Sequence, residues 1–150
     1  MAKALGGGVA IGAMMARPEI AKSLVPGTHA STFGGNSLAC AAAIAVIEAI
    51  EEDKLLDNTN ALGKYTRNKL EQLKEKYPII DHIRGKGLML GLQLNMPGAT
   101  IVNQCLEKGL RINCTQETVL RMMPSMTVTH GEIDAAIAIL EEVLGEGGCG

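Results

Sequence analysis

The sequence contains no tryptophan, one phenylalanine and two tyrosines, so aromatic side chains make up only 2% of its 150 residues. Any hydrophobic core must therefore be built from Ala, Ile, Leu, Val and Met, which favours helices packed against a modest sheet. With 47% hydrophobic residues, a chain of this length can bury one core, and this argues against a disordered protein. The composition predicts an α/β or α+β fold.

The charges are nearly balanced, with a formal net charge of -2 and dispersed Lys and Arg residues. No basic stripe is available to follow a phosphate backbone, and few aromatic rings are available to stack on bases. The most apolar stretch, residues 38–50, is about half the length needed to cross a bilayer. We therefore expect neither a nucleic acid nor a membrane as partner.

The four cysteines form no pattern that is typical of a metal site or a disulfide framework. Cys40, Cys105, Cys114 and Cys149 include no C-x-x-C pair and have no histidine at ligand spacing. They are interpreted as buried or incidental thiols, and no metal is expected. The start of the chain lacks a charged segment and a cleavage pattern typical of secretion, so a reducing cytoplasm is the expected location.

A glycine-rich segment near the N-terminus, Gly6–Gly8, precedes an apolar run at residues 9–15. This pattern predicts a loop followed by a buried strand. Such a strand needs neighbouring strands, and only two residues precede Lys3. We therefore expect the chain to be a truncated portion of a longer protein.

The next segment is expected to form two helices joined by a loop. Pro18 stands at a favourable first helical position, and the loop at residues 26–36 is rich in small polar residues. Either Asn36 or Ser37 can cap the following Ala-rich helix, which ends near Glu52. Because its apolar residues cover most of its circumference, we expect this helix to be largely buried.

The rest of the chain alternates helical and strand patterns. An amphipathic stripe with a solvated charged face predicts a helix that Pro78 stops, and Gly85 and Gly87 are interpreted as turn residues between two strands. Gly109 ends a second helix, and the tail from Gly145 should fray. The predicted elements are helices at about 53–77, 99–108 and 130–144, and strands at 79–84, 88–94, 110–113 and 118–123.

Lys3 precedes three glycines, where the backbone can approach a bound molecule closely. A desolvated lysine amine is a standard nucleophile for an aldehyde, although a lone lysine is most often simply solvated. The segment 2–13, AKALGGGVAIGA, resembles the cofactor-binding lysine segment of class III aminotransferases. The resemblance implies that Lys3 is the catalytic residue and forms a Schiff base with pyridoxal 5′-phosphate (PLP).

A second segment, 27–41, GTHASTFGGNSLACA, resembles a loop and the following helix of the same family. The resemblance implies that Ser31 and Thr32 bind the cofactor, with Thr32 touching the PLP phosphate of the partner subunit. A hydroxyl and exposed amides near a helix N-terminus suit a phosphate dianion. Seen alone, the same loop is also compatible with a simple helix-capping role.

Two further segments resemble the family in the same order, namely IRGKGLMLG at 83–91 and VLRMMPSMTVT at 119–129. In the first, Arg84 is interpreted as an ion-pairing surface residue. In the second, the resemblance implies that Arg121 binds the α-carboxylate of the substrate. A planar, permanently charged guanidinium matches a carboxylate with two hydrogen bonds, which suits this role.

The four segments cover nearly the entire chain, which therefore resembles the C-terminal portion of a fold-type I PLP-dependent transferase. The resemblance implies that residues 1–52 are a remnant of the PLP-binding large domain and that residues 53–150 form a small α+β domain. It also implies a homodimer. Because the groups that make PLP an electron sink would lie before Lys3, we expect the 150 residues alone to lack turnover.

The implied reaction is transamination between small amino and keto acids. The sequence of residues 27–33, GTHASTF, resembles most the enzymes that use acetylornithine as amino donor and 2-oxoglutarate as acceptor. This resemblance implies N-acetylglutamate semialdehyde as product and a role in arginine biosynthesis. Ornithine, succinylornithine and 4-aminobutyrate remain alternative donors, since the enzymes that use them share all four segments. A different alternative is that the isolated chain is only a folded interaction or dimerisation module.

Overall fold

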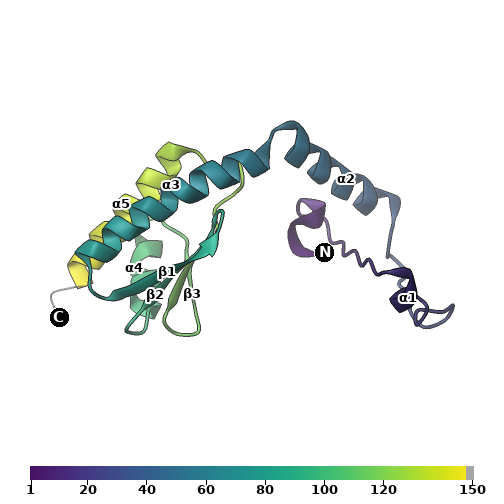
Figure 1. Cartoon of the computed structure of the whole chain (residues 1–150), viewed down its shortest axis with the longest axis horizontal. Coiled ribbons are helices and arrows are strands. Elements are labelled where there is room, and N and C mark those ends of the chain that lie inside the picture. The colour runs from purple at the N-terminus through teal and green to yellow at the C-terminus, as the bar shows by residue number, and fades with distance from the viewer. Residues whose placement is uncertain (148–150) are drawn as a thin grey trace. The chain divides into compact units, whose positions relative to one another are not determined.

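The computed structural model describes residues 1–147 and divides the chain into two compact units, Met1–Lys54 and Leu55–Gly150. The first unit contains a short 3-10 helix, η1 (Lys3–Gly6), and two α-helices, α1 (Pro18–Ala21) and α2 (Ser37–Glu52) (Figure 1). Pro18 is the first residue of α1, as predicted. The side chain of Asn36 caps α2 by accepting a hydrogen bond from the backbone N–H of Ala39 at 3.0 Å.

Two predictions for the first unit are wrong. Residues 9–15 form no strand, because the four strands of the described residues pair only with one another, all beyond Leu55. The helix α2 is not largely buried within this unit, where only Ala39 and Ala43 are fully buried. Its large apolar side chains stay in solvent, with Leu38 at 73% exposure, because η1 packs against one side of it only.

The second unit is a four-stranded antiparallel sheet with three helices. In chain order its elements are α3 (Leu55–Lys76), β1 (Ile80–Lys86), β2 (Met89–Leu94), α4 (Ala99–Glu107), β3 (Asn113–Thr115), β4 (Val119–Met122) and α5 (His130–Gly147). The strands are arranged in the order β1-β2-β4-β3. The α+β arrangement that the sequence predicts for this region is confirmed.

All three helices of this unit pack against one face of the sheet. Alternate strand residues such as Leu90, Leu92 and Leu120 point into the same core as Leu70 of α3 and Leu140 of α5. Figure 1 shows α3 and α5 lying side by side over the strands. Because neighbouring strand residues point to opposite faces, the other face carries a different set of side chains.

The helix α3 approaches the β1–β2 hairpin unusually closely. A Cβ atom on Gly63 would lie 2.5 Å from the carbonyl carbon of Gly87. Arg67, one turn further along, donates hydrogen bonds from its guanidinium to the carbonyl oxygens of Ile83 (3.1 Å) and Gly85 (2.7 Å). The sequence predicts that the whole charged face of α3 is solvated. This is wrong for Arg67, whose guanidinium binds the backbone of β1.

Two strand boundaries also differ from the prediction. Gly85 lies inside β1, with φ of 130°, and only Gly87 belongs to the turn. The strand β3 begins at Asn113, whereas residues 110–112 are outside it. The reason is the end of α4, where Gly109 takes a positive φ and Leu110 N donates to Cys105 O at 2.8 Å, so the chain is still completing the helix terminus.

The last helix is longer than the sequence predicts. It starts with a reciprocal capping box, in which the backbone N–H of Thr129 donates to the Glu132 carboxylate at 2.8 Å and Glu132 N donates to Thr129 Oγ1 at 3.3 Å. Near its end, Lys108, the residue directly after α4, forms ion pairs with Glu142 (2.8 Å) and Glu146 (3.0 Å). Residues 145–147 are therefore helical instead of frayed, and the rest of the predicted tail, with Cys149, lies outside the described residues.

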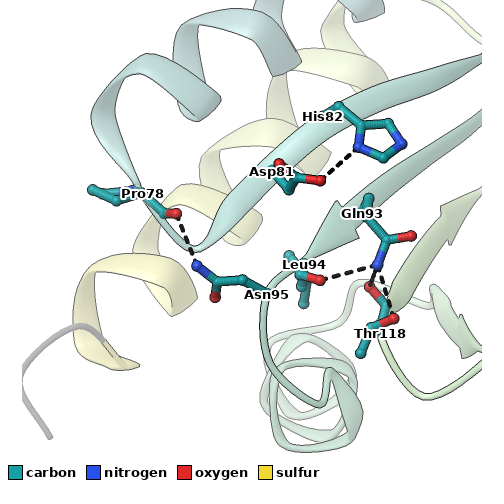
Figure 2. Close-up of polar contacts among 7 residues, drawn as sticks. All are labelled: Pro78, Asp81, His82, Gln93, Leu94, Asn95 and Thr118. Atoms are coloured by element: carbon teal, nitrogen blue, oxygen red, sulfur yellow. Dashed lines mark hydrogen bonds and ion pairs between the residues drawn. The ribbon is translucent and has the colours of Figure 1, made fainter.

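Polar contacts fix the end of the sheet where β2 leaves it (Figure 2). The Gln93 amide donates to Thr118 Oγ1 at 2.8 Å and to Leu94 O at 3.0 Å, which joins β2 to the turn before β4. The Asn95 amide donates to Pro78 O at 3.2 Å and so connects the residue after β2 to the segment between α3 and β1. These contacts support the register of β2 against its neighbours, and we assign them a structural role.

Candidate functional site

A hollow of about 380 Å³ lies within the first unit, beside the predicted cofactor loop. Residues 10–12, the loop residues His29, Ser31 and 33–35, and Ala39 line it. The loop is compact because Gly34 leaves room for Ser31, whose Oγ would lie 3.0 Å from a Cβ at position 34. Of the predicted site residues, only Ser31 borders this hollow, whereas Lys3 and Thr32 do not line it.

Lys3 opens η1 with a backbone φ of 60°, which side chains other than glycine seldom adopt. A residue in this region costs on the order of 1–3 kcal/mol, and such strain is often found at functional sites. The Lys3 side chain is exposed and makes no hydrogen bond or ion pair with another described residue. Its amine therefore has no partner among the described residues.

Thr32 lies in the turn before Gly34, with its side chain exposed. The neighbouring Thr28 hydroxyl donates to Val25 O at 2.7 Å, whereas no described group is hydrogen-bonded to the Thr32 hydroxyl. Lys3, Ser31 and Thr32 thus share the first unit and present polar side chains to solvent.

Arg121 lies in the middle of β4, on the sheet face that the helices leave uncovered. Its Nε donates a hydrogen bond to the side-chain oxygen of Asn113 at 3.1 Å. No carboxylate among residues 1–147 lies within ion-pair distance of its guanidinium. Hollows of about 390 Å³ and 290 Å³ open on its two sides, so the charge faces space that an anion can enter.

Arg84, which the sequence predicts to form ion pairs, has no acidic partner among the described residues. Its side chain lies over Gly91 of β2, where the Arg84 Cγ and Nε atoms would be 3.7 Å and 3.9 Å from a Cβ. The absence of a side chain at Gly91 leaves this space open. The long apolar stem of Arg84 therefore covers the sheet next to β4.

The structure adds Asn113 and Arg111 to the neighbourhood of Arg121, and sequence reasoning did not find either. A signal was present for Asn113, because a polar residue in a short strand can pair across the hairpin with a residue of the next strand. Using it requires the register of the hairpin, which depends on the three-residue turn. Arg111 carries no comparable signal.

The described residues contain no group of three or more side chains that could hold a metal ion, and none of their helices could span a membrane. Cys105 is fully buried in the core of the second unit, and burial raises the pKa of its thiol. Cys114 donates a hydrogen bond to Glu117 O at 3.0 Å. Neither thiol has the exposed, electropositive surroundings that make a cysteine reactive.

Proteins similar to this chain are named as aminotransferases. Over 146 residues the chain is 53% identical to the acetylornithine aminotransferase of Methanocaldococcus jannaschii, and over 144 residues it is 46% identical to that of Aquifex aeolicus. These matches cover 97% and 96% of the chain but only 37% and 36% of the two relatives. The chain thus spans little more than a third of the length of the relatives it matches.

Solved structures give the same result for the fold. The acetylornithine aminotransferase of Elizabethkingia anophelis matches 97% of the chain and 39% of its own length, with a TM-score of 0.85 at 31% identity. The ornithine aminotransferase of Toxoplasma gondii ME49 matches 98% of the chain and 36% of its own length, with a TM-score of 0.87 at 31% identity. The predicted fold-type I architecture is thereby confirmed. Because the family model of class-III aminotransferases matches residues 1–144, the chain belongs to the class-III aminotransferase family.

Proposed function

We propose that this chain is the C-terminal portion of a PLP-dependent acetylornithine aminotransferase, which transfers the amino group of N2-acetylornithine to 2-oxoglutarate in arginine biosynthesis. The observation that carries the proposal is the 53% identity to the Methanocaldococcus jannaschii enzyme over 97% of the chain. Identity at this level over a continuous stretch supports a shared substrate as well as a shared fold. The proposal includes a homodimer in the cytoplasm.

In this proposal, residues 1–52 are the end of the large cofactor domain and residues 53–150 are the small domain. The division of the chain after Lys54, a residue with φ of 52°, supports a boundary at this point. The large apolar side chains that α2 leaves in solvent, such as Leu38 and Ile44, fit a surface that other parts of a longer protein would cover.

The residues present fit the cofactor of this family. Lys3 has an unengaged amine next to a glycine-rich turn, and Ser31 and Thr32 bring hydroxyl groups to a loop at the N-terminus of α2. When bound, PLP withdraws electrons from the carbon that loses its proton. Lys3 Nζ would hold the cofactor covalently until the amino group of the donor displaces it, and the released amine would then move the proton at the substrate Cα. The Thr32 hydroxyl would donate a hydrogen bond to the cofactor phosphate held by the partner subunit.

Arg121 would bind the carboxylate that the amino donor and the keto acid share. Its guanidinium has no acidic partner among the described residues and faces two hollows. The side chain is exposed, so water solvates the charge until a ligand binds. A carboxylate substrate would replace that water with two parallel hydrogen bonds.

Ornithine is the second candidate donor, because a solved ornithine aminotransferase matches the fold as closely as the acetylornithine enzyme does. Initial rates of the full-length enzyme with acetylornithine, ornithine, succinylornithine and 4-aminobutyrate would decide between them. We expect the highest kcat/KM with acetylornithine. A higher value with ornithine would contradict the proposed donor while leaving the class of reaction intact.

The role of Lys3 is tested by Lys3→Ala in the full-length enzyme, with Lys22→Ala as the matched control. Both lysines are exposed in the same unit, so loss of a surface charge is common to the two variants. We expect Lys3→Ala to lose the visible absorbance of covalently bound PLP and nearly all turnover. Lys22→Ala should keep both. An unchanged spectrum in Lys3→Ala would remove Lys3 from the site.

The role of Thr32 is tested by Thr32→Val, with Thr28→Val as the control. If Thr32 donates to a phosphate, its loss should weaken PLP binding by about 1.5–3 kcal/mol, measured as retention of cofactor during dialysis. Thr28→Val removes a hydroxyl that donates only to Val25 O, so PLP retention should not change. Equal retention in both variants would contradict the assignment.

A further inference from the structure

Four residues form one continuous row across the sheet of the second unit. Arg84 of β1 is in register with Gly91 of β2, Gly91 with Arg121 of β4, and Arg121 with Asn113 of β3. Residues in register on neighbouring strands point to the same face. Because Leu90 and Leu120 point into the core, this row lies on the uncovered face.

The row fixes how the guanidinium of Arg121 can meet a ligand. A guanidinium has one N–H on Nε and four on its two terminal nitrogens. The side-chain oxygen of Asn113 accepts the hydrogen bond from Nε at 3.1 Å, so the edge that combines Nε with a terminal nitrogen is already engaged. The edge formed by the two terminal nitrogens is left for a carboxylate.

The chemistry of Asn113 is also informative. An amide oxygen accepts the hydrogen bond of Nε without neutralising the positive charge, whereas a carboxylate at the same position would form an ion pair with Arg121 and compete with a ligand. A neutral acceptor beside an arginine that has no acidic partner among residues 1–147 keeps the arginine both ordered and charged.

We propose that Asn113 is a positioning residue that holds Arg121 by its Nε and directs the two terminal nitrogens toward the substrate carboxylate. This inference rests on the proposed function, in which Arg121 binds that carboxylate. Without Asn113, the guanidinium must be immobilised each time a substrate binds, and this cost falls on binding alone. Asn113 therefore acts on KM, and kcat at saturating substrate does not depend on it.

The test uses Asn113→Ala and Asn113→Asp in the full-length enzyme, with KM and kcat measured for the amino donor and the keto acid. Asn113→Ala should raise both KM values by about 3- to 10-fold at unchanged kcat, as expected for one immobilised side chain. Asn113→Asp keeps the acceptor but neutralises Arg121, so its KM increase should be at least as large. Asn113→Gln keeps a neutral acceptor and should restore part of the loss.

Asn95→Ala and Asn95→Asp are the matched controls. Asn95 is an exposed asparagine of the same unit whose amide donates to Pro78 O, at the other edge of the sheet (Figure 2). These variants should keep wild-type KM values. A merely structural role of Asn113 would tolerate Asn113→Asp, because the hydrogen bond to Arg121 remains.

Arg121→Lys separates the failure of this inference from the failure of the proposed function. If Arg121→Lys raises both KM values and the Asn113 variants leave them unchanged, the positioning role is refuted and the carboxylate role of Arg121 stands. If Asn113→Asp matches the wild type while Asn113→Ala does not, the charge argument is refuted, and the inference with it. If Arg121→Lys itself leaves both KM values unchanged, the assignment of Arg121 in the proposed function is overturned together with the inference.

Discussion

Replacing Gly63 by alanine tests the close approach between α3 and the β1–β2 hairpin. By helix propensity alone, Gly63→Ala in the interior of α3 should stabilise the protein by about 1 kcal/mol. The structure predicts the opposite sign. The new Cβ would lie 2.5, 2.6 and 2.7 Å from the carbonyl carbon, the carbonyl oxygen and the Cα of Gly87, all of them backbone atoms.

The backbone of Gly87 cannot move aside as a flexible side chain could. Gly87 follows β1 directly in the hairpin turn and has φ of 53°. It also lies close to Thr59 of α3. Contacts between carbon atoms are comfortable at about 3.5–4.0 Å, so the helix and the hairpin must separate by roughly 1 Å. Such a separation strains the two hydrogen bonds from Arg67 to β1.

Overpacking costs about 1–3 kcal/mol, and a clash with three backbone atoms belongs in the upper part of that range, about 2–3 kcal/mol, which exceeds the gain of about 1 kcal/mol in helix propensity. We therefore expect a net loss of about 1–2 kcal/mol in the free energy of unfolding and a fall in Tm of roughly 4–8 °C per kcal/mol for a domain of this size. The measurement is urea and thermal unfolding of the 150-residue chain followed by far-ultraviolet circular dichroism.

Gly131→Ala is the matched control, since Gly131 is also helical but a Cβ there would have no atom within 4 Å. This variant should be neutral or more stable by up to about 1 kcal/mol. If Gly63→Ala is as stable as the wild type, or more stable, the close packing of α3 on the hairpin is wrong.

Two further predictions concern α5. Thr129→Ala removes the capping box with Glu132 and should lower the free energy of unfolding by about 1 kcal/mol in urea unfolding, whereas an unchanged midpoint would mean that the cap contributes nothing. The Tyr65 hydroxyl and then the Lys69 ammonium hold the pKa of Asp134 below its usual range, so the stability that this carboxylate provides is present above about pH 4 and is lost as the pH falls through its lowered pKa. Asp134→Asn should therefore lose less stability than the wild type on acidification, and identical acid transitions in the two proteins would contradict this reasoning.

Local patterns in the sequence were sufficient for most of the second unit. The amphipathic stripe of α3, the strand segments of β1 and β2 on either side of Gly87, and Gly109 at the end of α4 each act within a few residues, and the structure confirms all four elements. The predictions for residues 9–15 and for the burial of α2 are wrong because both depended on partners outside the local segment. An apolar pattern indicates that a segment can be buried, and what buries it is not encoded within that segment.

The site depends even more on register than on pattern. Lys3, Ser31, Thr32 and Arg121 were proposed from short motifs, and their roles stay predictions. The contact of Arg121 with Asn113 could not be predicted in this way, because the two residues meet only through the hairpin between β3 and β4.

The turn of that hairpin shows why. It has three residues, and Gln116 and Glu117 both adopt positive φ, 50° and 63°, without a glycine or asparagine to signal it. Each such residue costs on the order of 1 kcal/mol or more, so the turn is held by the pairing of the strands on either side and not by its own preference. A slip of one residue would turn Asn113 or Arg121 to the opposite face. Leu120 and Met122, the neighbours of Arg121 in the chain, are buried in the core, so Arg121 must lie on the open face of the sheet. The Asn113–Arg121 contact is therefore a consequence of the packed sheet.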